Sequence, residues 1–259
     1  TLFNLRKFNT NKFSMKNLIA IVAGEPNSIN SEIIAKAWKK FKNKKNLFVI
    51  GNYSLLKKQI KKINIKIPIL KIESVGNIGK EKFLYVLDIP LKFNSVFKDQ
   101  NADVRKYIFK SLDTAHNLAI NKKIKGFINT AIDKKIFFNK YLGVTEYLSS
   151  KNKIKNKEVM IIYNKKLSVV PLTTHLEIKN VTSKIKHNLI KKKILSLNDS
   201  YIKLFKTKPK IALLGLNPHN SENRLNSIES KIIKPSVKKL KQLGVNIAGP
   251  FPADTAFSG

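Results

Sequence analysis

The chain has 259 residues, 42% of them hydrophobic, so it can bury a substantial core as one large domain or as two coupled lobes. No stretch approaches the apolar length that spans a bilayer, which favours a soluble protein without a membrane partner. Cysteine is absent, which excludes disulfides, thiolate metal sites and a cysteine nucleophile, and fits a cytoplasmic enzyme.

The formal net charge is +35, with 51 lysines and arginines against 16 acidic residues. Basic side chains neutralise phosphates, so a nucleic-acid partner has to be considered. However, only Arg6, Arg105 and Arg224 are arginines, and the lysines are spread along the chain. Lys, Asn and Ile are all common and have codons rich in A and T, so genomic composition explains the charge better than nucleic-acid binding does.

Apolar runs predict strands at 17–23, 47–50, 69–72, 83–87, 126–129, 159–163, 168–172 and 211–215. Helical periodicity predicts helices from about Ser31, capped by Ser28 or Asn30, and over 54–62, 101–121, 178–205 and 228–242. Strands that alternate with helices indicate an α/β fold built of crossover units. The strands at 159–163 and 168–172 are close enough to form a hairpin, so the sheet is expected to be mixed.

Both ends of the chain are unusual. It begins at Thr1, and Met15 stands just before the first predicted strand. Residues 1–14 are interpreted as an N-terminal extension, with a targeting peptide as the alternative. Residues 249–257 resemble a loop, where an α/β domain rarely stops, so residues 15–259 are interpreted as a domain that lacks its C-terminal part.

Two of the four histidines follow predicted strands. His175 ends the segment Val-Val-Pro-Leu-Thr-Thr-His, and His219 ends Gly-Leu-Asn-Pro-His. Ligands of α/β proteins bind where the chain leaves the carboxyl ends of strands, and imidazole is a common ligand of catalytic metals. The two histidines are therefore candidate metal ligands, although two alone do not complete a site. His116 and His187 lie inside helical patterns and are interpreted as surface or packing residues.

Glycine patterns do not predict a nucleotide site. The segment from Gly76 to Lys80 lacks the spacer and the hydroxyl residue of a phosphate loop and is interpreted as a turn. No G-x-G-x-x-G follows the first strand, so a standard Rossmann dinucleotide site is not supported.

Several segments, taken in order, resemble the 4-hydroxythreonine-4-phosphate dehydrogenase family of pyridoxal phosphate biosynthesis. They are Gly24-Glu-Pro26, the segment from Gly126 to Lys134, Gly143-Val-Thr-Glu146, Leu172-Thr-Thr-His-Leu176, Gly215-Leu-Asn-Pro-His219 and Gly249-Pro-Phe-Pro-Ala-Asp-Thr255. The resemblance runs from about Met15 to the end of the chain, and the last three segments are its most specific part.

The resemblance implies a three-layer α/β/α fold like that of isocitrate and isopropylmalate dehydrogenases, with two coupled lobes, and a homodimer with active sites at the subunit interface. It also implies NAD- or NADP-dependent oxidation of 4-phosphooxy-L-threonine, with decarboxylation to 3-amino-2-oxopropyl phosphate. A divalent metal would lower the pKa of the substrate alcohol and stabilise the enolate that decarboxylation leaves. Zinc, magnesium, manganese and cobalt remain open, as does the choice between NAD and NADP.

By the same resemblance, His175 and His219 match two of the three family metal ligands. Thr145 matches a substrate-contacting threonine, with a helix N-cap as the alternative role. Asp254 matches a position near the metal centre and is assigned as catalytic, where it either orients a ligand or caps a turn. The family's third metal histidine and the Lys, Asn and Arg that hold the substrate would follow Gly259, so this chain is expected to be weakly active or inactive.

Two departures from the family keep alternatives open. Val144 stands where the family has a histidine and cannot donate to a phosphate or carboxylate, which favours a phosphorylated four-carbon sugar acid as the alternative substrate. Residues 27–31 replace a Gly-rich stretch with bulkier side chains. The high charge and the missing ligand leave a third alternative, a catalytically inactive basic protein that binds nucleic acid or another anion.

Overall fold

The structure is a computed structural model that describes residues 17–41, 46–79, 82–97, 103–137, 141, 143–152, 158–174, 176–220 and 224–257. The predicted N-terminal extension, residues 1–14, lies outside the described residues. The chain divides into two compact units, one within residues 1–136 and one within residues 137–259.

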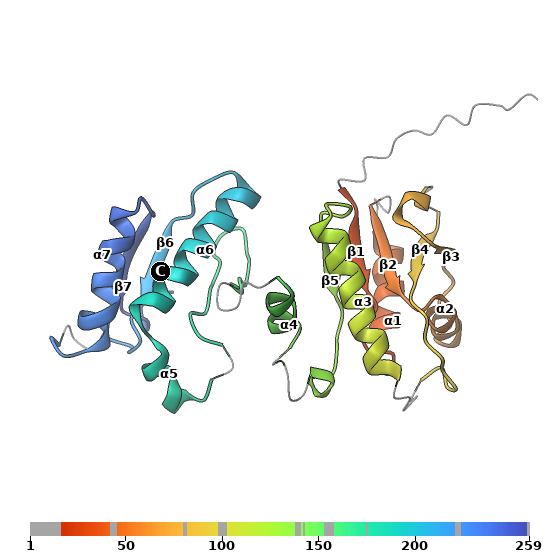
Figure 1. The fold of residues 1–259 in the computed structure, drawn as a ribbon, viewed down its shortest axis with the longest axis horizontal. Helices are drawn as coiled ribbons and strands as arrows, with labels where there is room; N and C mark the ends of the chain where they lie inside the picture. Colours follow the sequence, from red (N-terminus) through yellow and green to blue (C-terminus); the bar gives the residue numbers. More distant parts are fainter. Residues whose placement is uncertain are drawn as a thin grey trace, which may run out of the picture. The chain divides into compact units, whose positions relative to one another are not determined.

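The first unit is built on five parallel strands in the order β3-β4-β2-β1-β5 (Figure 1). The strands are β1 (Ile19–Val22), β2 (Leu47–Gly51), β3 (Ile69–Ile72), β4 (Leu84–Asp88) and β5 (Gly126–Asn129). Each one lies where an apolar run predicted a strand. Val49 in the middle of β2 pairs with Ile21 on one side and Val86 on the other, and is fully buried. Continuous apolar runs are what a parallel sheet covered on both faces requires.

Three helices cover this sheet: α1 (Asn30–Lys40), α2 (Tyr53–Lys62) and α3 (Asp103–Ile120). Ile34 and Trp38 of α1 and Leu56 of α2 pack with Val49 in one core cluster. Helix α3 packs along β1, β2 and β5. Figure 1 shows α3 in front of the sheet and α1 and α2 behind it. The first unit therefore has the predicted three-layer α/β/α architecture.

The second unit is built around a pair of parallel strands, with Ile211 opposite Ile247. Its elements are α4 (Val144–Lys151), α5 (Ile178–Lys184), α6 (His187–Phe205), β6 (Ile211–Leu214), a π-helical turn (Glu229–Ile233), α7 (Lys234–Gln242) and β7 (Ile247–Phe251). Ile190 of α6 packs with Leu240 of α7 and with Ile247 of β7 to form the core of this unit.

The predicted hairpin is reduced to one antiparallel bridge between Ile162 and Val169. Ile162 is 61% exposed, so no buried face stabilises a longer ladder there. All named strands of the described residues pair in parallel, so the expectation of a mixed sheet was wrong beyond this bridge.

The predicted helix at 178–205 is two helices, because Ile185 and Lys186 are extended. Ile185 is 5% exposed and belongs to the core of the second unit, so its burial outweighs continuation of the helix. Strand β7 was not predicted, because Gly249 and Pro250 interrupt the apolar run. A two-stranded sheet tolerates them, since each strand is an edge. No helix of the described residues is long and apolar enough to cross a membrane.

Candidate functional site

Two loops of the first unit meet where β1 and β5 end. The strand order reverses here, because β2 lies on one side of β1 and β5 on the other, and α/β proteins bind ligands at such points. Asn30 joins the loops: its Nδ2 donates to the carbonyl oxygens of Ala23 and Ala131 at 3.1 and 2.8 Å, and its Oδ1 accepts the N–H of Ala131 at 3.1 Å. Ile29 holds the N-cap position of α1, so the predicted cap at Ser28 or Asn30 was wrong; the Asn30 amide serves tertiary hydrogen bonds instead.

Gly24 lies beneath this junction with a φ of +69°. A Cβ atom there would lie 2.4 Å from Thr130 Oγ1 and 2.6 Å from the carbonyl oxygen of Ala131, so only glycine fits. Burial raises the pKa of the adjacent Glu25 carboxyl; the N–H of Asn27 opposes this shift, and the charge of Asp133 adds to it. The Gly-Glu-Pro motif is therefore a close backbone junction that carries a carboxyl of raised pKa.

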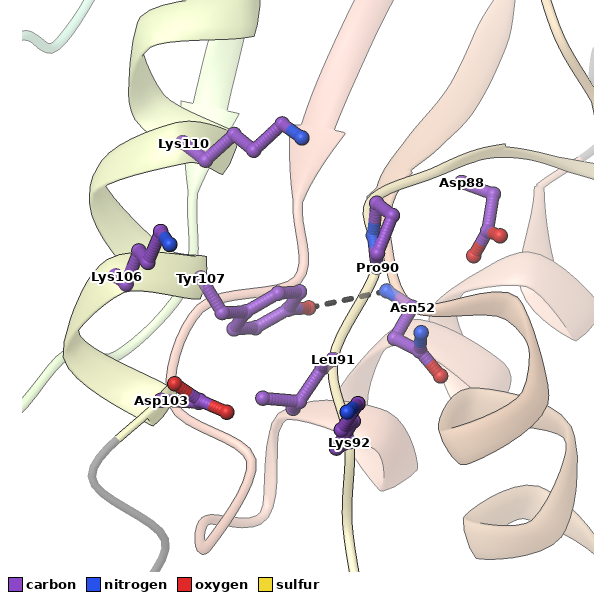
Figure 2. Close-up of a pocket in the computed structure, with 9 residues that line it drawn as sticks. All are labelled: Asn52, Asp88, Pro90, Leu91, Lys92, Asp103, Lys106, Tyr107 and Lys110. Carbon is purple, nitrogen blue, oxygen red and sulfur yellow. Dashed lines mark hydrogen bonds between the residues drawn. The ribbon is translucent and has the colours of Figure 1, made fainter.

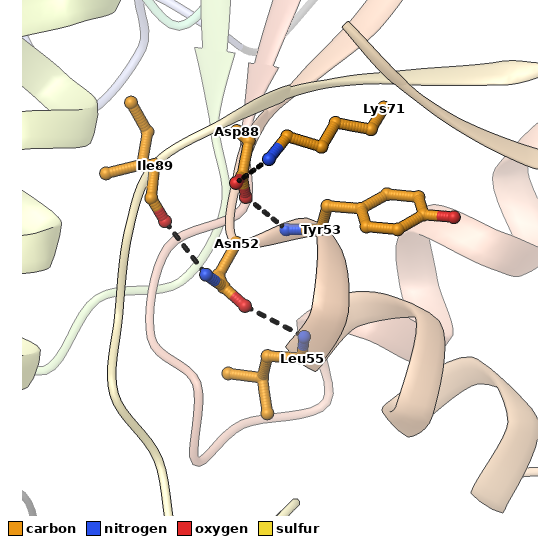
Figure 3. Close-up of polar contacts among 6 residues, drawn as sticks. All are labelled: Asn52, Tyr53, Leu55, Lys71, Asp88 and Ile89. Atoms are coloured by element: carbon orange, nitrogen blue, oxygen red, sulfur yellow. Dashed lines mark hydrogen bonds and ion pairs between the residues drawn. The ribbon is translucent and has the colours of Figure 1, made fainter.

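A second polar network lies at the N-terminus of α2 (Figure 3). Asn52 is its N-cap: Oδ1 accepts the N–H of Leu55 at 2.9 Å, and Nδ2 donates to the carbonyl oxygen of Ile89 at 3.0 Å. One oxygen of Asp88 accepts the N–H of the first residue of α2 at 2.8 Å, and the other pairs with Lys71 at 3.0 Å. The hydrogen bond to Asp88 raises the pKa of Lys71. The network fixes the ends of β2 and β4 to each other. The carboxylate of Asp88 occupies the N-terminus of α2.

Beside this network opens a cavity of about 470 Å³ (Figure 2). It is lined by residues that follow β2 and β4 and by the first turns of α3: Asn52, Asp88, Pro90, Leu91, Lys92, Asp103, Lys106, Tyr107 and Lys110. The Tyr107 hydroxyl accepts the N–H of Asn52 at 3.2 Å. Burial raises the pKa of Tyr107 to about 12, so the hydroxyl keeps its proton. The volume is in the usual range for small-molecule sites.

In the second unit, a turn leaves β6 and leads to His219. One oxygen of Glu229 accepts the N–H of Leu216, the N–H of Asn217 and the side-chain amide of Asn217, each at 3.0 Å. Glu229 is only 2% exposed and lies in the π-helical turn, a feature often found at functional sites. A buried carboxylate therefore sets the course of the turn.

The loop after β7 runs alongside this turn, because Ala253 N–H donates to the carbonyl oxygen of Pro218 at 2.8 Å. His219 Nδ1 lies 2.9 Å from Asp254 Oδ2, and the other Asp254 oxygen accepts the N–H of Thr255 at 2.9 Å. A carboxylate oxygen only accepts, so Nδ1 carries a proton, and in the neutral form of the ring Nε2 has a free lone pair. Asp254 thus contacts the histidine and also caps its own turn. The predicted alternatives, orienting a ligand and capping a turn, are therefore both compatible with its contacts.

These donors fit a divalent metal, because metal-bound histidines usually donate their second ring N–H to a carboxylate. The His219 side chain is 75% exposed, so its outer nitrogen is accessible. His175, the other predicted ligand, lies outside the described residues. Within the part of the chain that the structure describes, no group of three or more His, Asp or Glu side chains could hold a metal ion. The structure places one of the two predicted ligands, together with its orienting carboxylate.

Thr145 lies in the first turn of α4 and is exposed. Gly143 holds the N-cap position, so the alternative role of Thr145 as the cap was wrong: the helix begins at Val144, two residues before the start that a cap at Thr145 would give. Further along α4, Ser149 Oγ donates to Glu158 Oε2 at 2.9 Å. The substrate contact predicted for Thr145 therefore stays a prediction, made from a position that solvent reaches.

The two remaining histidines have the predicted packing roles. His116 is 8% exposed within α3, and Nδ1 of His187 lies 2.8 Å from Ser236 Oγ, which links α6 to α7. The contributions of Glu229 and Asn30 and the cavity beside Tyr107 were missed. The local pattern predicts Asn30 as a helix cap, and nothing in it marks Glu229 as buried.

A parallel α/β sheet with joined loops at its carboxyl edge, and a carboxylate-oriented histidine after a strand of the second unit, are features of α/β enzymes that handle small ligands. Residues 43–259 match the protein family described as Pyridoxal phosphate biosynthetic protein PdxA. The chain belongs to this family, and the resemblance seen in its motifs is confirmed.

Named relatives are dehydrogenases. The chain is 34% identical to the 4-hydroxythreonine-4-phosphate dehydrogenase of Sulfurihydrogenibium sp., over 93% of this chain and 76% of the relative. It is 26% identical to the D-threonate 4-phosphate dehydrogenase of Salmonella typhimurium, over 92% of this chain and 76% of that protein. The crystal structure of a 4-hydroxythreonine-4-phosphate dehydrogenase from Burkholderia phymatum is similar at 26% identity, with a TM-score of 0.80, over 93% of this chain and 76% of that one. These likenesses confirm the dehydrogenase fold class.

Proposed function

We propose that the chain oxidises 4-phosphooxy-L-threonine with NAD or NADP and decarboxylates the product to 3-amino-2-oxopropyl phosphate, in pyridoxal phosphate biosynthesis. The observation that carries the proposal is the contact between His219 and Asp254, in a chain of a family whose named relatives are dehydrogenases of this type. Asp254 holds the ring so that Nε2 faces outward as a ligand.

The proposed metal site comprises His219 and His175. A divalent cation, when bound there, acts as a Lewis acid that favours hydride loss from an alcohol and stabilises the negative charge that decarboxylation leaves. Asp254 accepts the Nδ1 proton and keeps the imidazole in one tautomer and orientation. Thr145 offers an exposed hydroxyl that can donate to a polar substrate group.

Turnover and metal binding test this proposal together. The chain is incubated with 4-phosphooxy-L-threonine, NAD or NADP, and zinc, magnesium, manganese or cobalt in turn, and the reduced cofactor is measured by absorbance. Turnover by the chain is expected to be weak, and His219→Ala should remove what there is and reduce the metal retained after dialysis. The matched control is His187→Ala, which removes a histidine bound to Ser236 and should retain the metal. Equal metal binding in wild type and His219→Ala would contradict the proposed site.

A phosphorylated four-carbon sugar acid is the second candidate substrate. Two observations favour it: Val144 stands where the family has a histidine, and one relative is named D-threonate 4-phosphate dehydrogenase. Parallel kinetics with 4-phosphooxy-L-threonine and D-threonate 4-phosphate separate the candidates. A higher kcat/KM for the sugar acid, together with a gain for the amino acid in Val144→His, would favour the second substrate.

The proposal includes a cytoplasmic homodimer, as the family resemblance implies. Exposed apolar side chains around the antiparallel bridge support an interface there: Ile162 is 61% exposed, Leu167 57% and Tyr163 51%. A cluster of exposed apolar side chains favours association between protein chains. Light scattering after size exclusion would measure the mass, and a strictly monomeric chain at all concentrations would contradict this part.

A further inference from the structure

We propose that the cavity between α3 and the loop after β4 binds the phosphate group of a small-molecule ligand, held by Lys106 and Lys110. The cavity lies wholly within the first unit and shares no residue with the His219 turn. The inference rests on the proposed function only for the choice of phosphate compounds to be tried.

The cavity is in the position where this architecture binds ligands. It opens at the carboxyl ends of β2 and β4, where Asn52 follows β2 and Asp88 is the last residue of β4. Parallel α/β sheets bind small molecules at this edge, because strand ends, helix starts and variable loops meet there. A volume of about 470 Å³ admits a phosphate ester with a short carbon skeleton or part of a larger nucleotide.

Two lysines of α3 supply the attraction for an anion. Lys106 and Lys110 are four residues apart, so they lie on the same face of the helix, one turn from each other. Both lysines line the cavity, and Figure 2 shows the Lys110 side chain extended from α3 toward the loop of Pro90. Neither has an ion-pair partner among the residues that the structure describes.

The remaining charges of the cavity leave an excess of positive charge. Lys92 adds a third ammonium group, and the lining carboxylates are Asp88 and Asp103. Asp88 is already paired with Lys71 at 3.0 Å, so it offsets little of the charge that a ligand would meet. Counted together with Lys71, the four lysines carry two charges more than the two carboxylates Asp88 and Asp103, which favours a ligand of about two negative charges, such as a phosphate monoester.

The rest of the lining suits the carbon part of such a ligand. Pro90 and Leu91 form an apolar wall, and the ring of Tyr107 lies between the lysine-bearing turns and Asn52 (Figure 2). The Tyr107 hydroxyl is protonated and neutral, so it does not repel an anion. The Asn52 side chain is committed to Leu55 and Ile89, which keeps this wall rigid.

The shared chemistry is a phosphate group, and two sources could supply it: the phosphorylated substrate or the diphosphate of the nicotinamide cofactor. The experiment is calorimetric titration of the full chain with inorganic phosphate, 4-phosphooxy-L-threonine and NAD, each at physiological salt. Salt at this level screens diffuse attraction to the charged surface. The test variant is Lys106→Gln/Lys110→Gln, which keeps a polar side chain only one atom shorter and removes both charges.

The matched control is Lys234→Gln/Lys238→Gln, which removes the same charge from two exposed lysines four residues apart on α7. Wild type and control should bind at least one of the three probes, and the test variant should bind it about tenfold more weakly or worse. Loss for 4-phosphooxy-L-threonine assigns the cavity to the substrate, and loss for NAD assigns it to the cofactor.

Three results would overturn the inference: no binding of any probe, equal binding by the test variant, or an equal loss in the control. Its failure is separable from failure of the proposed function. Turnover that is unchanged in Lys106→Gln/Lys110→Gln but abolished in His219→Ala removes the phosphate cavity and retains the dehydrogenase. Specific phosphate binding without turnover of either candidate substrate retains the phosphate cavity and removes the dehydrogenase.

Discussion

The carboxylate of Glu229 accepts two hydrogen bonds from Asn217, one from the backbone N–H and one from the side-chain amide, each at 3.0 Å. Glu229 is 2% exposed, and the same oxygen also accepts the N–H of Leu216. Asn217 lies two residues before His219, so the buried acid determines where the histidine-bearing turn can lie. The acid is retained in the interior because its hydrogen bonds compensate for lost hydration.

Replacement of Glu229 by alanine should therefore destabilise the second unit. It leaves three N–H groups without their acceptor, at roughly 1–3 kcal/mol for each group that stays buried, so a loss of about 3 kcal/mol or more is expected. Glu229→Gln, which keeps one acceptor oxygen, should cost less. Urea unfolding measures both, and amide exchange should speed up at Leu216 and Asn217. Glu177→Ala, which removes a solvent-exposed ion pair with Lys179, is the control and should cost under about 1 kcal/mol.

The junction at Gly24 predicts a second stability difference. Gly24 and Gly244 both have positive φ, +69° and +79°, but a Cβ meets Thr130 and Ala131 at the first and nothing within 4 Å at the second. Gly244→Ala should cost about 1–2 kcal/mol from backbone strain alone. Gly24→Ala should cost clearly more, because close backbone atoms must also move. Equal unfolding free energies for the two variants would show that the β1 and β5 loops are not held together as described.

The sheet of the first unit was predictable because its strands are continuous apolar runs, and such runs need burial on both faces. The elements of the second unit were less predictable. Ile185 breaks a helical pattern by packing into the core, and β7 contains Gly249 and Pro250. Both depend on long-range contacts that local periodicity does not report.

The candidate site shows the same division. His219 and Asp254 were found because their motifs resemble a family, and the structure brings them into contact across two loops. Glu229 and the cavity around Tyr107 were missed, since a buried acid and a solvated one look alike in sequence. Whether Glu229 and Tyr107 are buried depends on which side of their helix faces the interior. The sequence of a single helical turn does not predict that side.

Tyr107 gives a prediction for alkaline pH. Its pKa is raised from 10.0 to about 12 because burial disfavours the phenolate. Between these values the unfolded chain loses the proton and the folded chain keeps it, so folding stability falls as pH rises, by roughly 2–3 kcal/mol in all. Tyr107→Phe should be less stable than wild type at pH 8, because it removes the acceptor of the Asn52 N–H, and this deficit should shrink above about pH 10.

Unfolding free energies of wild type and variant at several pH values measure this effect, and subtraction cancels the other tyrosines and the lysines. Tyr201→Phe is the control, because it removes a hydroxyl from a tyrosine of α6 that lies outside the proposed interface. A deficit for Tyr107→Phe that is constant from pH 8 to 12 would show that the hydroxyl is not desolvated.

Asp254 separates orientation of the histidine from simple turn formation. Asp254→Asn retains an oxygen for the Thr255 N–H but removes the negative charge at 2.9 Å from His219 Nδ1. If Asp254 orients a metal ligand, affinity for divalent metal should fall about 10- to 100-fold, since loss of such partners has effects of this size. The free energy of unfolding should change by less than about 1 kcal/mol, because the contact between His219 and Asp254 lies at the surface.

Competition with a chromophoric chelator measures the affinity, and Asp199→Asn on the exposed face of α6 controls for the loss of one negative charge. If Asp254 only capped its turn, both variants would bind metal as wild type does. A fall in affinity for Asp254→Asn alone, at unchanged stability, would assign the carboxylate to orientation of the imidazole. The buried Glu229 would then position the turn from within, and Asp254 would select the ring nitrogen available to a metal.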